Sequence, residues 1–203
     1  MKTSNNFNRK TIFIIIGVVL GILLVLALVD FLLILTGKQM IVPASACEEL
    51  FGCAPEEFLH QKSNSYSEVG NFRRLARVDA KGQLILYLTQ KQANVWCSLL
   101  QQELNDAENQ YNIDISDDYS VITVYGYEET YLEEGTRAAK LIYKMVLIRN
   151  MRGENSSYRY ILKDAVTGNT VIVRGVDDNG QNLNYHNQNH KFSSIIEKDK
   201  PSQ

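Results

Sequence analysis

Three cysteines and three histidines are the side chains best suited to nucleophilic or metal chemistry. Cys47 and Cys53 are separated by five residues, which permits a structural disulfide if the intervening segment is looped. The spacing leaves both the bonded and the free state open. Cys97 falls on the apolar repeat of a predicted helix, where a thiol acts as a small core residue rather than a nucleophile.

The histidines and carboxylates do not define a metal or catalytic site. His186 and His190 have the i, i+4 spacing of a helical metal pair, but "NYHNQNHK" is a poor helix former without a nearby acidic ligand. Carboxylates cluster at residues 114–118, 128–134 and 177–178, and nothing in their spacing selects a catalytic pair. We therefore predict no catalytic residue, no metal ligand and no cofactor site.

A basic stripe is predicted on one helical face. Arg137, Lys140 and Lys144 follow one another at i, i+3 and i+7, so their side chains project to the same side of a helix. Such a stripe docks anionic lipid or an acidic partner. The alternative is the solvated face of a helix whose basic end complements its own dipole.

The chain contains 11 tyrosines, and four of them lie between residues 119 and 131. Tyr125 and Tyr127 alternate along a predicted strand. Tyrosine is enriched in binding surfaces, whereas on a strand beside a helix it also serves as core. Together with the basic stripe, these two tyrosines form the candidate interaction surface.

The charge balance excludes one class of partner. With 21 Lys and Arg against 23 Asp and Glu among 203 residues, the formal net charge is −2. A mildly acidic chain lacks the basic footprint of a nucleic-acid-binding protein. We expect no nucleic-acid partner.

Residues 11–37 read as a retained membrane span. Nineteen consecutive residues from Thr11 to Val29 carry no charge, more than the apolar core of about 7–15 residues in a cleaved signal peptide. As a helix this run spans the hydrocarbon layer of a bilayer. A cleaved signal ending at Ala44-Ser45-Ala46, or a lipoprotein modified at Cys47, is the weaker alternative because the triplet lies well beyond the apolar run.

The flanking charges predict the orientation. Lys2, Arg9 and Lys10 precede the span, and only Lys38 follows it closely. Positive charge is retained on the cytoplasmic side. We therefore expect residues 1–10 in the cytoplasm and the C-terminal part outside the cell membrane, as in a single-pass signal-anchor protein.

Polar and small residues within the span add two expectations. Asp30 lies toward the outer interface in one register and is buried against a polar partner helix in another. Gly17 and Gly21 form a G-x-x-x-G spacing that permits close approach of two helices and so a homodimer.

The periodicity of the remaining chain predicts a sequence of elements. Residues 38–70 read as an extracytoplasmic tether with short helical turns, residues 71–178 as a folded domain, and residues 179–203 as a polar, disordered tail. Capping boxes at Thr89–Gln92 and Thr130–Glu133 predict the starts of two helices, the second ending near Arg152. The predicted strands are 72–78, 84–88, 119–127, 158–163 and 170–174.

The order ββαβαββ predicts a two-layer α+β domain, with one mostly antiparallel or mixed sheet and two helices on one face. The expected function is a membrane-anchored extracytoplasmic binding module without catalysis, acting on a protein or envelope partner. The alternative is a membrane-tethered envelope hydrolase that uses Asp and Glu. A deep pocket holding two carboxylates would favour the hydrolase.

Overall fold

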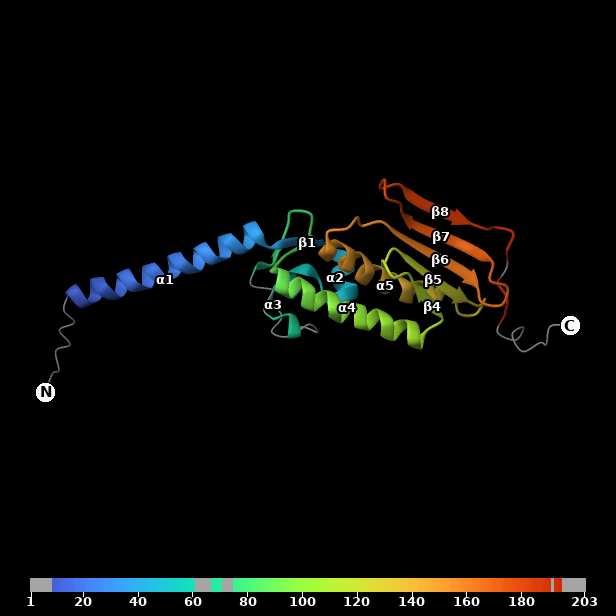
Figure 1. Ribbon diagram of the computed structural model, residues 1–203, viewed down its shortest axis with the longest axis horizontal. Coiled ribbons are helices and arrows are strands. Elements are labelled where there is room, and N and C mark those ends of the chain that lie inside the picture. The colour runs from blue at the N-terminus through green and yellow to red at the C-terminus, as the bar shows by residue number, and fades with distance from the viewer. Residues whose placement is uncertain (1–8, 61–66, 71–74, 191, 195–203) are drawn as a thin grey trace.

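The computed structural model describes residues 9–60, 67–70, 75–190 and 192–194. The fold is mixed α+β with two sheets, as predicted for the class (Figure 1). The elements in chain order are α1 Arg9–Thr36, β1 Lys38–Val42, α2 Ala44–Phe51, α3 Pro55–His60, a 3-10 turn η1 Ser67–Val69, β2 Arg77–Val78, β3 Leu84–Leu88, α4 Gln90–Gln110, β4 Ile113–Ile115, β5 Val121–Gly126, α5 Tyr131–Arg152, β6 Tyr158–Asp164, β7 Thr170–Val176 and β8 Asn182–His186.

Helix α1 projects from one end of the molecule (Figure 1). Apart from the half-buried Leu33, its large apolar side chains from Ile12 to Leu35 are exposed around the helix. Among the described residues it is the one helix long and apolar enough to cross a membrane. An apolar helix at this position serves as an anchor or as a signal sequence.

The junction between α1 and β1 is tightly packed. The Gly37 N–H donates to the Leu33 carbonyl at 2.7 Å. A Cβ at Gly37 would lie 2.4 Å from that oxygen and 3.0 Å from the Leu88 carbonyl oxygen, so only glycine fits. The next residue, Lys38, donates through Nζ to the Met151 carbonyl near the C-terminal end of α5.

Sheet A is antiparallel with the order β1-β3-β2. The predicted hairpin is confirmed where β2 pairs with β3, but β2 covers only Arg77–Val78 of the predicted strand 72–78, part of which lies outside the described residues. Strand β3 is central, with Leu84, Ile85, Leu86 and Leu88 buried. The single predicted sheet is wrong, because β1 pairs along the other edge of β3. With both edges occupied, β3 cannot join the remaining strands.

The segment expected to be a tether is part of the folded structure. Met40 and Val42 of β1, Ala46 and Cys47 of α2 and Phe58 of α3 are buried in the same apolar cluster as the later elements. The expected helical turns are present as α2 and α3. Part of the proposed boundary near residue 71 lies outside the described residues. Burial of these side chains makes 38–60 a structural layer rather than a spacer.

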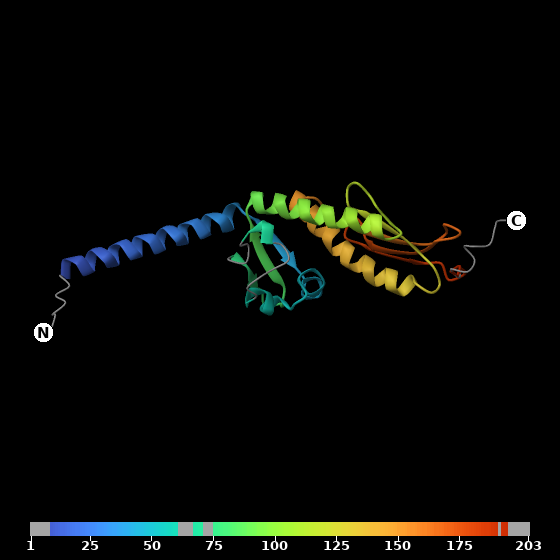
Figure 2. The ribbon, with the colours of Figure 1, turned by 90° about the horizontal axis from the view of Figure 1, so that it is seen from below.

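Sheet B is mixed, with the order β4-β5-β6-β7-β8. Strands β5 and β6 are parallel and are connected through α5, whereas the other pairs are antiparallel. Helices α4 and α5 pack against each other, α5 against β5 and β6, and α4 against β4 (Figure 2).

The two predicted capping boxes have different outcomes. Thr89 and Gln92 form a complete box at the start of α4, as predicted. Thr130 precedes α5 without a side-chain cap, and its hydroxyl instead accepts from the Tyr127 N–H at 3.3 Å. Helix α5 nevertheless ends as predicted, at Gly153 with φ 78°.

Part of the expected disordered tail is instead structured, in residues 182–190 and 192–194, and residues 195–203 lie outside the described residues. Strand β8 pairs with β7, and the Phe192 ring stacks on Tyr131 with 5.1 Å between ring centroids. The Ser193 N–H donates to Oδ2 of the buried Asp164 at 2.5 Å. The polar composition of this segment did not indicate a strand, because the segment is held by backbone pairing and by one buried carboxylate rather than by an apolar stripe.

Candidate functional site

The predicted basic stripe lies along α5, and each of its cations has an intramolecular partner. Arg137 also stacks on the Tyr111 ring at 4.0 Å. The ion pairs are Arg137–Glu134 at 2.6 Å, Lys140–Glu49 at 3.2 Å and Lys144–Glu103 at 2.6 Å. Two of these pairs join α5 to α2 and α4. Neutralised cations attract an external anion less strongly, so this arrangement favours a structural role for the stripe.

Cys47 and Cys53 are both buried and lie beside each other, and no disulfide joins them in the structure. Burial, followed by the proximity of Cys53, raises the pKa of the Cys47 thiol to about 12. A thiol that stays protonated at neutral pH is not a nucleophile. The disulfide between them stays a prediction.

The described histidines and carboxylates do not converge on a metal site. His186 is exposed on β8, while Nε2 of His190 lies 3.4 Å from Oδ2 of Asp164. In the described part of the chain, no three His, Cys, Asp or Glu side chains group closely enough to hold a metal ion.

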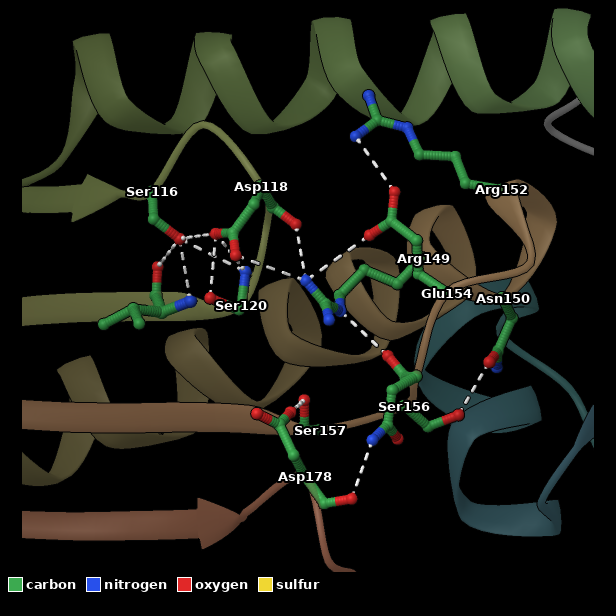
Figure 3. A network of polar contacts seen from close by, with 12 residues as sticks. Ser116, Asp118, Ser120, Arg149, Asn150, Arg152, Glu154, Ser156, Ser157 and Asp178 are labelled. Carbon is green, nitrogen blue, oxygen red and sulfur yellow. Dashed lines mark hydrogen bonds and ion pairs between the residues drawn. The ribbon is translucent and has the colours of Figure 1, made fainter.

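A polar network surrounds Arg149, whose side chain is 9% exposed (Figure 3). Its Nε donates to the Asn155 carbonyl and its Nη1 to the Asp118 carbonyl, both at 2.9 Å. The Ser116 and Ser120 hydroxyls donate to the Asp118 carboxylate and lower its pKa to about 2. Arg149 thereby fixes the β4–β5 turn to the segment that follows α5.

The network continues to the turn between β7 and β8. The Asn155 amide donates to the Asp178 carbonyl at 2.9 Å, and the Ser157 hydroxyl donates to the Asp178 carboxylate at 2.6 Å (Figure 3). Its longer-range contacts join the end of α5 and the segment after it to the β4–β5 and β7–β8 turns, and no serine in the network is paired with a histidine base. The arrangement positions one end of sheet B and does not form a nucleophilic site.

The outer face of sheet B, opposite α5, is an open surface. One row of directly paired residues crosses all five strands: Asp114, Thr123, Ile161, Val173 and Tyr185. None of its apolar members belongs to the main core cluster, and Tyr185 is 51% exposed. Ile161 and Val173 are half-buried, and no helix of the described chain covers this strip.

Two cations flank this strip on the central strand β6. Arg159 is exposed and Lys163 is half-buried, and they stand two residues to either side of Ile161. Within the described residues no carboxylate forms an ion pair with either cation. The outer face thus combines an apolar centre with two cations, and one of them, Arg159, lines a cavity together with Asp177 and Asp178.

Of the two predicted tyrosines, the structure places Tyr125 on this face. Its hydroxyl donates to the Asp114 carboxylate at 2.7 Å, which raises the pKa of the phenol. The Lys163 ammonium lies 5.8 Å from the centre of its ring. Tyr127 follows β5 in the turn that leads to α5, so it is not part of the strip.

Most residues of the outer face were missed at the sequence level. The alternation of Arg159, Ile161 and Lys163 with the buried Tyr160 and Leu162 is visible in the sequence and indicates two faces. The pairing of β6 with β5 and β7 decides which residues share a face with Tyr125, and that information is not local. Val173 and Tyr185 are added by pairing alone.

Comparisons with protein-family models, with curated proteins and with solved structures find no significant match.

Proposed function

We propose that this chain is a single-pass membrane-anchored binding module, in which α1 is the anchor and the outer face of sheet B binds an acidic partner protein. The observation that carries the proposal is the uncovered apolar strip flanked by Arg159 and Lys163. An apolar centre with charge at its rim is the anatomy of a protein-binding surface. The complementary partner presents an apolar residue surrounded by carboxylates.

The position of this face supports the proposal. Sheet B lies at the end of the molecule opposite α1, with sheet A between them (Figure 1). A membrane-anchored chain with this shape presents the outer face away from the lipid surface, where a partner protein has access.

The partner is tested by charge reversal on β6. The double variant Arg159→Glu, Lys163→Glu should lose at least about tenfold in affinity, because it opposes an acidic partner with two like charges. A photo-crosslinker at Val173 should capture a defined partner with the natural chain and not with the variant. The affinity of the purified partner should also fall as salt is added.

A matched control separates the site from net charge. Lys81→Glu, Lys91→Glu makes the same charge change at two exposed positions outside sheet B. It should retain the crosslinked product and the affinity. Equal capture by a folded Arg159, Lys163 double variant would exclude the outer face as the binding surface.

The flanking charges support an orientation with the N-terminus in the cytoplasm. Protease added to intact cells is expected to digest the part that follows α1, while a cytoplasmic marker survives. Full protection of that part would contradict the orientation, and a mature N-terminus after Ala46 would contradict the anchor. Dimerisation through Gly17 and Gly21 stays a prediction.

The described structure does not add support for the alternative hydrolase. A cavity of about 430 Å³ between α5 and sheet B has no Asp, Glu, His or Cys in its lining. A second cavity, of about 260 Å³, is lined by Asp177 and Asp178. Both carboxylates already accept hydrogen bonds that hold the β7–β8 turn and its neighbour, from Gln181 and Ser157. Their present role is structural.

A further inference from the structure

The larger cavity is a groove on the inner face of sheet B, on the opposite side from the outer face. Helix α5 covers β5 and β6, and the groove lies where it meets β6 and β7. One wall is the α5 stripe that contains Tyr131, Gly135 and Ala139, and the other is formed by β6 and β7. A volume of about 430 Å³ falls within the usual range of small-molecule sites.

Small residues on α5 keep this groove open. A Cβ added at Gly135 would meet only the Tyr160 hydroxyl, at 3.8 Å, which is ordinary contact. Ala139, four residues along, lines the same wall. Because neither residue fills the space above Tyr160, the floor of the groove stays accessible from the side of β7.

The lining combines aromatic rings with hydroxyl groups. Tyr158 and Tyr160 project from β6, and Tyr131 enters from the first turn of α5. Tyr131 is fixed from behind by the stacked Phe192 ring. Burial raises the pKa of Tyr160 to about 12, so its hydroxyl remains a donor at neutral pH.

Arg174 supplies the charge of the groove. It is exposed on β7 directly opposite Tyr160, and its guanidinium acts electrostatically on the Tyr160 phenol. Among the described residues no carboxylate forms an ion pair with Arg174. Glu134 also acts on Tyr160, but its carboxylate is held by Arg137 at 2.6 Å. The groove therefore presents one uncompensated cation beside apolar and aromatic walls.

From this geometry we infer that the groove binds a small amphipathic carboxylate, whose apolar body lies between α5 and β6 and whose carboxylate pairs with Arg174. The planar guanidinium offers two parallel N–H donors, which match the two oxygens of a carboxylate. The aromatic walls of Tyr131 and Tyr158 match a flat or aliphatic body. This site is separate from the proposed partner surface.

The test compares a charged probe with its neutral counterpart on the full chain in lipid nanodiscs. Ligand-observed NMR titrations use 4-phenylbutyrate and 4-phenylbutyramide, with empty nanodiscs as the reference for lipid partitioning. We expect saturable binding of the carboxylate, about tenfold tighter than the amide, as a charge-assisted hydrogen-bond pair provides. Equal affinity of the two probes, or no saturable binding of the carboxylate, would overturn the inference.

Two variants locate the binding in the groove. Arg174→Gln should lower the affinity for the carboxylate probe by about tenfold and leave the affinity for the amide probe unchanged. Arg159→Gln removes the same charge from the outer face and should change neither affinity. Arg174→Lys keeps the charge but loses the planar guanidinium, so its affinity for the carboxylate should lie between that of the natural chain and that of Arg174→Gln. Unchanged carboxylate binding by Arg174→Gln would exclude the site.

A variant that fills the groove tests the binding site without changing any charge. Gly135→Leu places a side chain into the groove from a helical position where Cβ fits, so both probes should lose binding while the melting temperature is retained. Binding that survives in this variant would overturn the inference. Capture of the acidic partner should be unaffected by Arg174→Gln, which keeps the two proposals separately testable.

Discussion

Replacing Trp96 by alanine is expected to lower the free energy of unfolding of the part that follows α1 by about 3–5 kcal/mol. The Trp96 side chain is fully buried on α4, and its ring lies 6.0 Å from the Phe51 ring of α2. Loss of the indole leaves a cavity between the N-terminal layer and α4. Urea unfolding followed by circular dichroism measures the change without relying on the deleted fluorophore.

The control is a substitution on the same helix that touches no core residue. Gln102 is exposed on α4, and Gln102→Ala should change stability by no more than about 0.5 kcal/mol. A loss below about 1 kcal/mol in Trp96→Ala would mean that α2 and α4 do not share a core.

Replacing Asp164 by alanine is expected to lower the free energy of unfolding by about 2–4 kcal/mol, because several partly buried donors lose their acceptor together. Oδ1 accepts from the N–H groups of Val166 and Thr167 at 3.0 and 2.7 Å, and Oδ2 from Ser193. Asp164→Asn keeps the first set of contacts and weakens the second. It should therefore release the C-terminal segment selectively, seen as faster amide exchange after β8.

The same carboxylate predicts a loss of stability in acid. Burial alone would raise the pKa of Asp164, but the N–H groups of Ser193, Thr167 and Val166 and the Thr167 hydroxyl lower it below its ordinary value. A lowered pKa means that the ionised form stabilises the fold, fully above pH 4 and progressively less as the pH falls below about 4. Asp118, with a pKa of about 2, acts in the same direction.

The melting temperature measured against pH checks this sign. The natural chain should lose stability below about pH 4, and Asp164→Asn should show a shallower decline over the same interval. A natural chain whose melting temperature stayed constant to pH 2 would contradict the assigned hydrogen bonds.

Local patterns in the sequence were sufficient to predict several helices and strands, but not how the strands pair into sheets. The hairpin of β2 and β3, the capped start of α4 and the end of α5 at Gly153 follow from turn and cap residues that act over a few positions. Strand β1 could not be predicted in this way, since "KQMIV" is short and follows an apolar span. Only its pairing with β3 makes it a strand.

The candidate surfaces show the same limit. Tyr125 was identified from residue type, and the structure adds its neighbours Ile161 and Val173 through cross-strand pairing. The groove depends on Arg174 lying opposite Tyr160, a register that a bulge at Leu162–Lys163 helps to set. Such a juxtaposition of residues from β6 and β7 is not encoded in any single segment.

The glycine junction between α1 and β1 has a mechanical consequence. Because Gly37 is packed against the Leu33 and Leu88 carbonyls, no flexible linker separates the proposed anchor from the first strand. Under the proposed anchoring, tension applied by a partner on sheet B would pass into β1 at Lys38 and be borne by its backbone ladder with β3. The chain would then behave as a stiff lever at the membrane, so lateral movement of a captured partner would turn into tilting of α1 in the bilayer.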